Sequence, residues 1–85
     1  GFKKTEVSEY RNKFTIAYQN TDAVDFEDGR GEGWRRKEAM LRVYEKQANV
    51  TRGTAWNHFS KYAKDMFTVT KEKKVVYLKL KEQNE

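Results

Sequence analysis

The residues with the most capacity for chemistry lie close together in the stretch NVTRGTAWNHFSKYAKD, residues 49–65. Arg52, Asn57 and Lys61 offer a guanidinium, an amide and an ammonium group, which bind ligands through hydrogen bonds and charge. Catalysis and metal binding need other groups, and this chain has one His, no Cys and no Ser adjoining a general base. We therefore expect binding chemistry, with no catalytic residue, no metal ion and no cofactor.

Apolar residues in this stretch recur at steps of 4, 3 and 4, which predicts a helix over 51–65 capped by the Thr51 hydroxyl. The apolar stripe comprises Ala55, Phe59, Tyr62 and Met66. The residues on the opposite side are Gly53, Asn57, Ser60, Lys61 and Lys64. Trp56 lies about 100° from Ala55, so two interpretations stay open: it packs beside that small residue, or it faces a ligand.

Two further helices are expected upstream. Apolar residues at steps of 3, 4 and 3 predict a helix over 6–19, although KFTIAYQ also has some of the alternation of a strand. The acidic, glycine-rich residues 20–33 predict a long mobile loop. Met40, Val43 and Tyr44 share one stripe of a second helix over 34–48.

The C-terminal residues alternate as a strand does. Val76, Leu78 and Leu80 fall on one face, with Tyr77 and Lys79 on the other. Residues 67–81 therefore predict a β-hairpin with a charged tip at 71–74, which lacks the Asn-Gly or Asp-Gly signal of a two-residue turn.

Charge is concentrated in one part of the chain. Residues 1–33 carry five Lys/Arg against seven Asp/Glu, whereas residues 34–81 carry thirteen against four, a net charge of +9. A compact basic region is typical of proteins that bind polyanions, and the alternative is a basic surface that merely keeps the domain soluble.

The 85 residues are enough for a single domain, 1–85. Because the chain begins with Gly, we expect a domain excised from a longer protein; the lack of Cys and of any membrane-length apolar run favours an intracellular location without a membrane partner.

The order of a helix, a short turn, a capped helix and a basic hairpin over residues 34–81 resembles the winged helix-turn-helix family. The motif of its turn and recognition helix is matched by Val50, Thr51, Arg52, Gly53, Thr54, Ala55, Phe59 and Tyr62. Ala55 is smaller, and Trp56 larger, than the residues usual at those places. The resemblance implies a small α+β fold with about three helices followed by a C-terminal β-hairpin wing, and a recognition helix over 51–65 that enters the major groove.

The resemblance also implies roles for individual residues. Arg52 and Asn57 are expected to read bases, because guanidinium matches guanine and amide matches adenine. Thr54 and Ser60 are expected to contact phosphates, Lys61 and Lys64 to supply charge, and Gly53 to let the backbone approach the duplex. The remaining candidates are Trp56, Arg35 and Arg36 at the start of the 34–48 helix, and the wing residues Lys71, Lys73 and Lys74.

Two functions are compatible with this pattern. The first is a double-stranded DNA-binding module of a transcription regulator or of a replication or mobile-element protein. The second is a winged-helix module that docks a protein partner, for instance through the 20–33 loop, without binding DNA. A docking module has no need for a net charge of +9 on 48 residues, so the sequence favours DNA.

Overall fold

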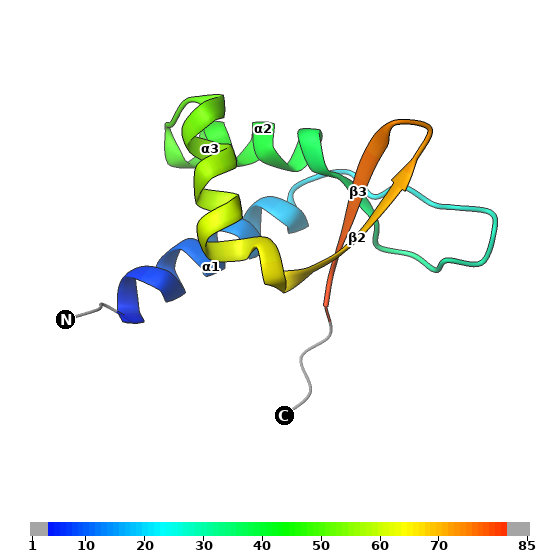
Figure 1. Ribbon diagram of the computed structural model, residues 1–85, viewed down its shortest axis with the longest axis horizontal. Helices are drawn as coiled ribbons and strands as arrows, with labels where there is room; N and C mark the ends of the chain where they lie inside the picture. The colour runs from blue at the N-terminus through cyan, green and yellow to red at the C-terminus, as the bar shows by residue number, and fades with distance from the viewer. Residues whose placement is uncertain (1–3, 82–85) are drawn as a thin grey trace.

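The computed structural model describes residues 4–81 and shows three helices followed by a C-terminal β-hairpin (Figure 1). The helices are α1 (Lys4–Gln19), α2 (Lys37–Ala48) and α3 (Arg52–His58), and α3 continues through a π turn, η1 (Phe59–Ala63), and a 3-10 turn, η2 (Lys64–Met66). The strands are β1 (Arg35–Arg36), β2 (Phe67–Glu72) and β3 (Val75–Leu80), in the antiparallel order β1-β3-β2. This α+β arrangement is the predicted layout of a small winged helix. Within the described residues, no helix has the length and apolarity needed to cross a bilayer.

Helix α1 supplies the centre of the core, as its apolar spacing predicts. Phe14 and Ala17 are fully buried, which excludes the strand interpretation of this segment. The Phe14 ring stacks on Tyr44 of α2 at 4.0 Å between centroids and meets Phe59 edge-on at 5.7 Å. Three helices therefore converge on one group of aromatic rings.

Helix α2 begins at Lys37, three residues later than predicted. Arg35 and Arg36 are extended and form β1, pairing with Leu78 and Tyr77 of β3. Arginine favours helices, but pairing with a distant strand outweighs this weak local preference. At the other end the prediction of a tight turn is confirmed, because Asn49 is left-handed (φ 57°) and its N–H donates to the Glu45 carbonyl.

The third helix is capped as predicted, but its second half changes the buried stripe. Thr51 accepts a hydrogen bond from the Thr54 N–H at 3.3 Å. The π turn that follows shifts the helical phase, so Ala63 enters the core and Tyr62, predicted in the buried stripe, is half-buried. Tyr62 instead stacks on Tyr10 at 4.3 Å, at the edge of the core.

The predicted hairpin is present, with a shorter tip than expected. Its register runs from Phe67↔Leu80 to Glu72↔Val75. The turn is Lys73–Lys74 alone, with φ angles of 50° and 70°, so Lys71 is a strand residue rather than part of the tip. Positive φ at both turn residues matches a type I′ turn, which favours Asn-Gly, so two lysines here cost stability.

Residues 20–33 form contacts with the helices and the sheet that the prediction of a mobile loop did not include. Val24 bridges to Trp34, its N–H donating to the Trp34 carbonyl at 2.7 Å. The buried Thr21 hydroxyl donates to the Ala17 carbonyl at 2.7 Å. The Phe26 ring lies edge-on to Tyr77 at 4.9 Å, so the loop covers part of the outer face of the sheet.

Phe59→Ala should lower the free energy of unfolding by about 3–5 kcal/mol, since Phe59 is 3 % exposed and packs against Phe14 and Phe67. That is a large part of the ~5–15 kcal/mol of an ordinary domain. Val69→Ala is the matched control, because Val69 is 54 % exposed. Thermal melts check the prediction, and a Phe59→Ala melt as high as the control's would show that the core is assigned wrongly.

Candidate nucleic-acid interface

The predicted recognition residues lie together on the side of α3 that is turned away from the core. The exposed members are Arg52, Gly53, Trp56, Asn57, Ser60, Lys61 and Lys64. The opposite side holds the buried Ala55, Phe59 and Ala63. The fold therefore leaves free the predicted side of the helix, despite the π turn.

Two of the predicted residues in the first turn of α3 also have polar partners inside the domain. The Arg52 Nε lies 3.7 Å from Glu45 Oε2 of α2, while its side chain stays 56 % exposed. Thr54, predicted to contact phosphate, is half-buried, and its hydroxyl oxygen accepts from the Thr51 hydroxyl at 3.1 Å. Both residues thus help to join the turn to α3, and Arg52 retains an accessible guanidinium.

Gly53 occupies a helical position that the fold does not reserve for glycine. Its φ is not positive, and an added Cβ would have no heavy atom within 4 Å. Glycine within a helix costs roughly 0.5–1 kcal/mol relative to alanine. The unfilled space in front of Gly53 suits the close backbone approach predicted from the sequence.

A cavity of about 220 Å³ lies where α2, α3 and the hairpin meet, and we refer to it as the junction pocket. It is lined by Arg36, Lys37, Glu38, Trp56, Lys74, Val75 and Val76. Trp56 is 40 % exposed, so it both borders the pocket and reaches solvent. Two separate segments of the chain, residues 36–37 and the hairpin turn, thus bring cations to one aromatic side chain of a third.

Lys37 is the one cation of this pocket that was not among the residues predicted to bind DNA. Its Nζ lies 4.2 Å from the ring centroid of Trp56 and 5.0 Å from that of Phe59. Burial, and then the charge of Lys64, lower the pKa of the Lys37 ammonium group. In the sequence, Lys37 is indicated only by the run of cations Arg35-Arg36-Lys37. That run does not tell which of the three side chains is bound inside the domain and which reaches the pocket.

Arg35 has a structural role in place of the predicted DNA contact. Its guanidinium donates to the carbonyls of Tyr18, Thr21 and Gly33 at 3.1, 3.0 and 2.8 Å, and it lies 4.1 Å from the Tyr18 ring centroid. The expectation that Arg35 begins a helix and is free for DNA is therefore corrected. Arg36, its neighbour, is exposed and lines the junction pocket.

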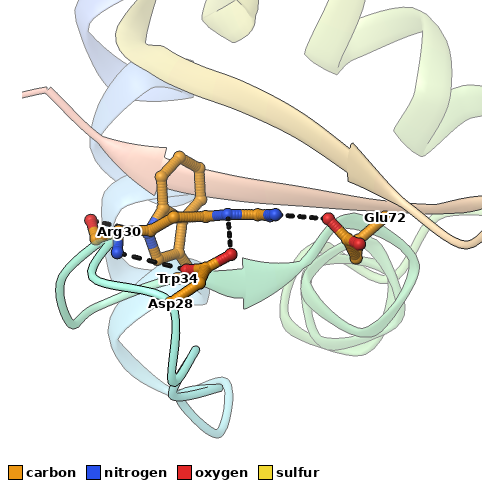
Figure 2. Close-up of polar contacts among 4 residues, drawn as sticks. All are labelled: Asp28, Arg30, Trp34 and Glu72. Atoms are coloured by element: carbon orange, nitrogen blue, oxygen red, sulfur yellow. Dashed lines mark hydrogen bonds and ion pairs between the residues drawn. The ribbon is translucent and has the colours of Figure 1, made fainter.

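Arg30 connects the 20–33 loop to the hairpin (Figure 2). Its guanidinium forms ion pairs with Asp28, at 2.8 Å, and with Glu72 of β2. The Trp34 indole donates to the Arg30 carbonyl at 3.4 Å, and Phe26 lies beneath the guanidinium at 4.5 Å. Glu72 directly precedes the turn, so its carboxylate is the one nearest in sequence to Lys73 and Lys74. The ion pair with Arg30 offsets the negative charge of this carboxylate.

His58 faces the core side of α3 and contributes no chemistry to the exposed side. Its Nδ1 lies 2.9 Å from the Tyr44 hydroxyl oxygen, and its ring is 4.6 Å from that of Tyr10. Burial, and then the charges of Lys13 and Lys61, lower the pKa of His58 below its usual 6.5. Burial raises the pKa of Tyr44 to about 12, so this hydroxyl stays protonated at neutral pH.

Comparisons with models of known protein families, with curated proteins and with solved structures gave no match to this chain. Among the described side chains, no group of three His, Asp or Glu is placed to hold a metal ion. The interface is therefore interpreted from its own geometry and charge.

The lowered pKa of His58 predicts that stability falls as pH drops from about 7.5 to about 5.5. The unfolded chain takes up a proton near pH 6.5, where folded His58 resists it, so protons favour unfolding. His58→Gln keeps an acceptor for the Tyr44 hydroxyl and removes the titration, so its stability should change less over this range. Equal slopes for parent and variant in urea titrations would refute this assignment.

Proposed function

We propose that this domain binds double-stranded DNA, with the exposed side of α3 in the major groove and the hairpin turn on the phosphate backbone. The observation that carries the proposal is a set of exposed or half-buried cations without carboxylate partners on the continuation of α3, beside the start of α2 and on the hairpin. They are Arg36, Lys37, Lys61, Lys64, Lys71, Lys73 and Lys74, none of which forms an ion pair with a carboxylate of the described residues. A phosphate backbone supplies the missing negative charge.

The arginines in the described part of the chain behave differently from these lysines. Arg11, Arg30, Arg42 and Arg52 each have a carboxylate partner, and Arg35 is held by backbone carbonyls. Most of the arginines thus form contacts within the domain. The lysines beside α3 and in the turn remain available as mobile charges for phosphates.

The arrangement of the elements suits this proposal. The first residues of α3 and the hairpin turn lie at the same edge of the molecule, with the start of α2 between them (Figure 1). In a helix-turn-helix complex the recognition helix reads base edges with its N-terminal residues. Arg52 and Asn57 are the base-reading candidates here, and Gly53 gives the backbone room to approach.

Docking of a protein partner is the alternative function, and binding rather than catalysis is proposed in both cases. The 20–33 loop exposes the carboxylates of Asp22, Asp25, Glu27, Asp28 and Glu32. A docking module that used this loop would leave the cations at α3 without a ligand and would show no salt-dependent affinity for DNA. The parent protein is proposed to be a transcription regulator or a replication or mobile-element protein.

The test is duplex affinity between about 50 and about 200 mM salt, for the parent and for Lys73→Asn/Lys74→Gly. The parent should lose affinity steeply as salt rises. The variant removes two charges, yet Asn-Gly suits the type I′ turn, so it should fold at least as stably. Its affinity should fall on all duplexes, and the salt slope should flatten by about one unit per lost phosphate contact.

Lys13→Ala/Lys79→Ala is the matched control, because it removes the same charge from α1 and from the face of the sheet that the loop covers. It should retain more affinity than the turn variant. Equal losses for the two variants would show that net charge alone drives binding. A parent without salt-dependent duplex binding would favour the docking function.

A further inference from the structure

We propose that the junction pocket receives one unpaired nucleotide, so that the preferred ligand is duplex DNA with a single-stranded end or branch. This inference rests on the proposed DNA-binding function and narrows its substrate class. It assigns to Trp56 a stacking role against a base, and to Lys37 and its cationic neighbours a contact with the phosphate of the same nucleotide.

The lining of the pocket combines two chemistries in one small space. The indole of Trp56 and the side chains of Val75 and Val76 are apolar, whereas Arg36, Lys37 and Lys74 are cationic. Glu38 is the one carboxylate in the lining, and it lies 3.5 Å from Arg42. A nucleotide has the complementary pair of features, a flat ring and an anionic phosphate. Aromatic side chains set in basic grooves are the usual means of binding single strands.

Lys37 holds the position that a base would take. Its Nζ lies over the Trp56 ring, 4.2 Å from the ring centroid, where the face of the indole attracts a cation. The ammonium is half-buried and lies near the charge of Lys64, with no described carboxylate paired to it. A nucleotide would improve both contacts, because the base would cover the indole and the phosphate would pair with the displaced ammonium.

The size of the pocket limits what it takes. Its volume of about 220 Å³ is below the ~300–1,000 Å³ of pockets that hold drug-sized ligands, so one ring system fits better than two. A base within a duplex is stacked on both faces and cannot reach the indole without leaving the helix. An unpaired base at an end or a branch meets no such obstacle.

Trp56 differs from the other exposed apolar side chains by its place in the pocket. Among the side chains that the structure describes, the exposed large apolar ones are Ile16, Trp56 and Val69, and neither Ile16 nor Val69 lines the junction pocket. Ile16 is 40 % exposed, the same fraction as Trp56. It therefore provides a matched control for the loss of one exposed apolar side chain.

The test compares three labelled DNAs that share one duplex sequence, by fluorescence anisotropy at one salt concentration. One is blunt, one carries a short single-stranded overhang, and one carries the same overhang built from abasic sugars. The parent should bind the normal overhang about fivefold or more tightly than the blunt duplex, which is the effect of stacking one base on an aromatic ring. The abasic overhang should lose most of this preference, because it retains the phosphates and lacks the rings.

Protein variants then locate the effect. Trp56→Ala should bind the normal and the abasic overhang alike, whereas Ile16→Ala should keep the preference of the parent. The abasic DNA tests the same contact without altering the protein, so a poorly folded Trp56→Ala variant does not decide the outcome.

Each other result has a defined meaning. Equal binding of blunt and overhanging duplexes by the parent overturns the inference and leaves the proposed function standing. A preference that survives undiminished in the abasic overhang, or in folded Trp56→Ala, shows that the pocket does not hold the base and also overturns it. Failure to bind any of the three DNAs overturns the proposed function itself, and the inference with it.

Discussion

The pairing of β1 with β3 is the constraint on which the arrangement of the candidate interface depends. This ladder is two residues long, yet it joins the start of α2 to the middle of β3 in the hairpin. Arg35 strengthens the joint by donating to carbonyls at the end of α1 and in the loop that follows. Arg36 and Lys37 come next along the chain, so their distance from the hairpin turn is determined by this pairing. Without it, the cations of the junction pocket would not face one another.

The candidate interface also requires that the small core hold α3 firmly in place while the polar side of this helix stays exposed. Phe14, Tyr44 and Phe59 come from three helical segments and form one aromatic group in the core. Rings of this size bury more area per residue than aliphatic side chains, which matters in a chain with few of the latter. The small Ala55 and Ala63 bring α3 and its continuation close to this group. The core thus uses one side of α3 and leaves the other exposed.

The sequence predicts those features that depend on local periodicity. The core faces of α1 and α2, the Thr51 cap and the hairpin all follow from spacing that one segment of the chain contains. Strand β1 could not be predicted, because two residues have no period and the pairing partner lies about forty positions away. The π turn was missed for a related reason, since no periodic pattern in the sequence marks a shift of helical phase.

The same division applies to the candidate site. The exposed residues of α3 were predicted because they lie opposite an apolar stripe, but the different fates of Arg35, Arg36 and Lys37 depend on tertiary contacts. The pairing of Arg30 with Glu72 likewise joins residues 42 positions apart. Charge per segment predicted a polyanion site, whereas the structure shows which cations lack a carboxylate partner among the described residues.

The most direct test of the central claim is a map of backbone amide shifts by NMR as a short DNA duplex is added at low salt. The account predicts that the amides that shift most belong to α3, to residues 36–38 and to the hairpin turn. Amides of α1 and of residues 22–32 should change little. A map centred on the 20–33 loop, or no shifts at a salt concentration where phosphate contacts are strongest, would contradict the assignment of this face to DNA.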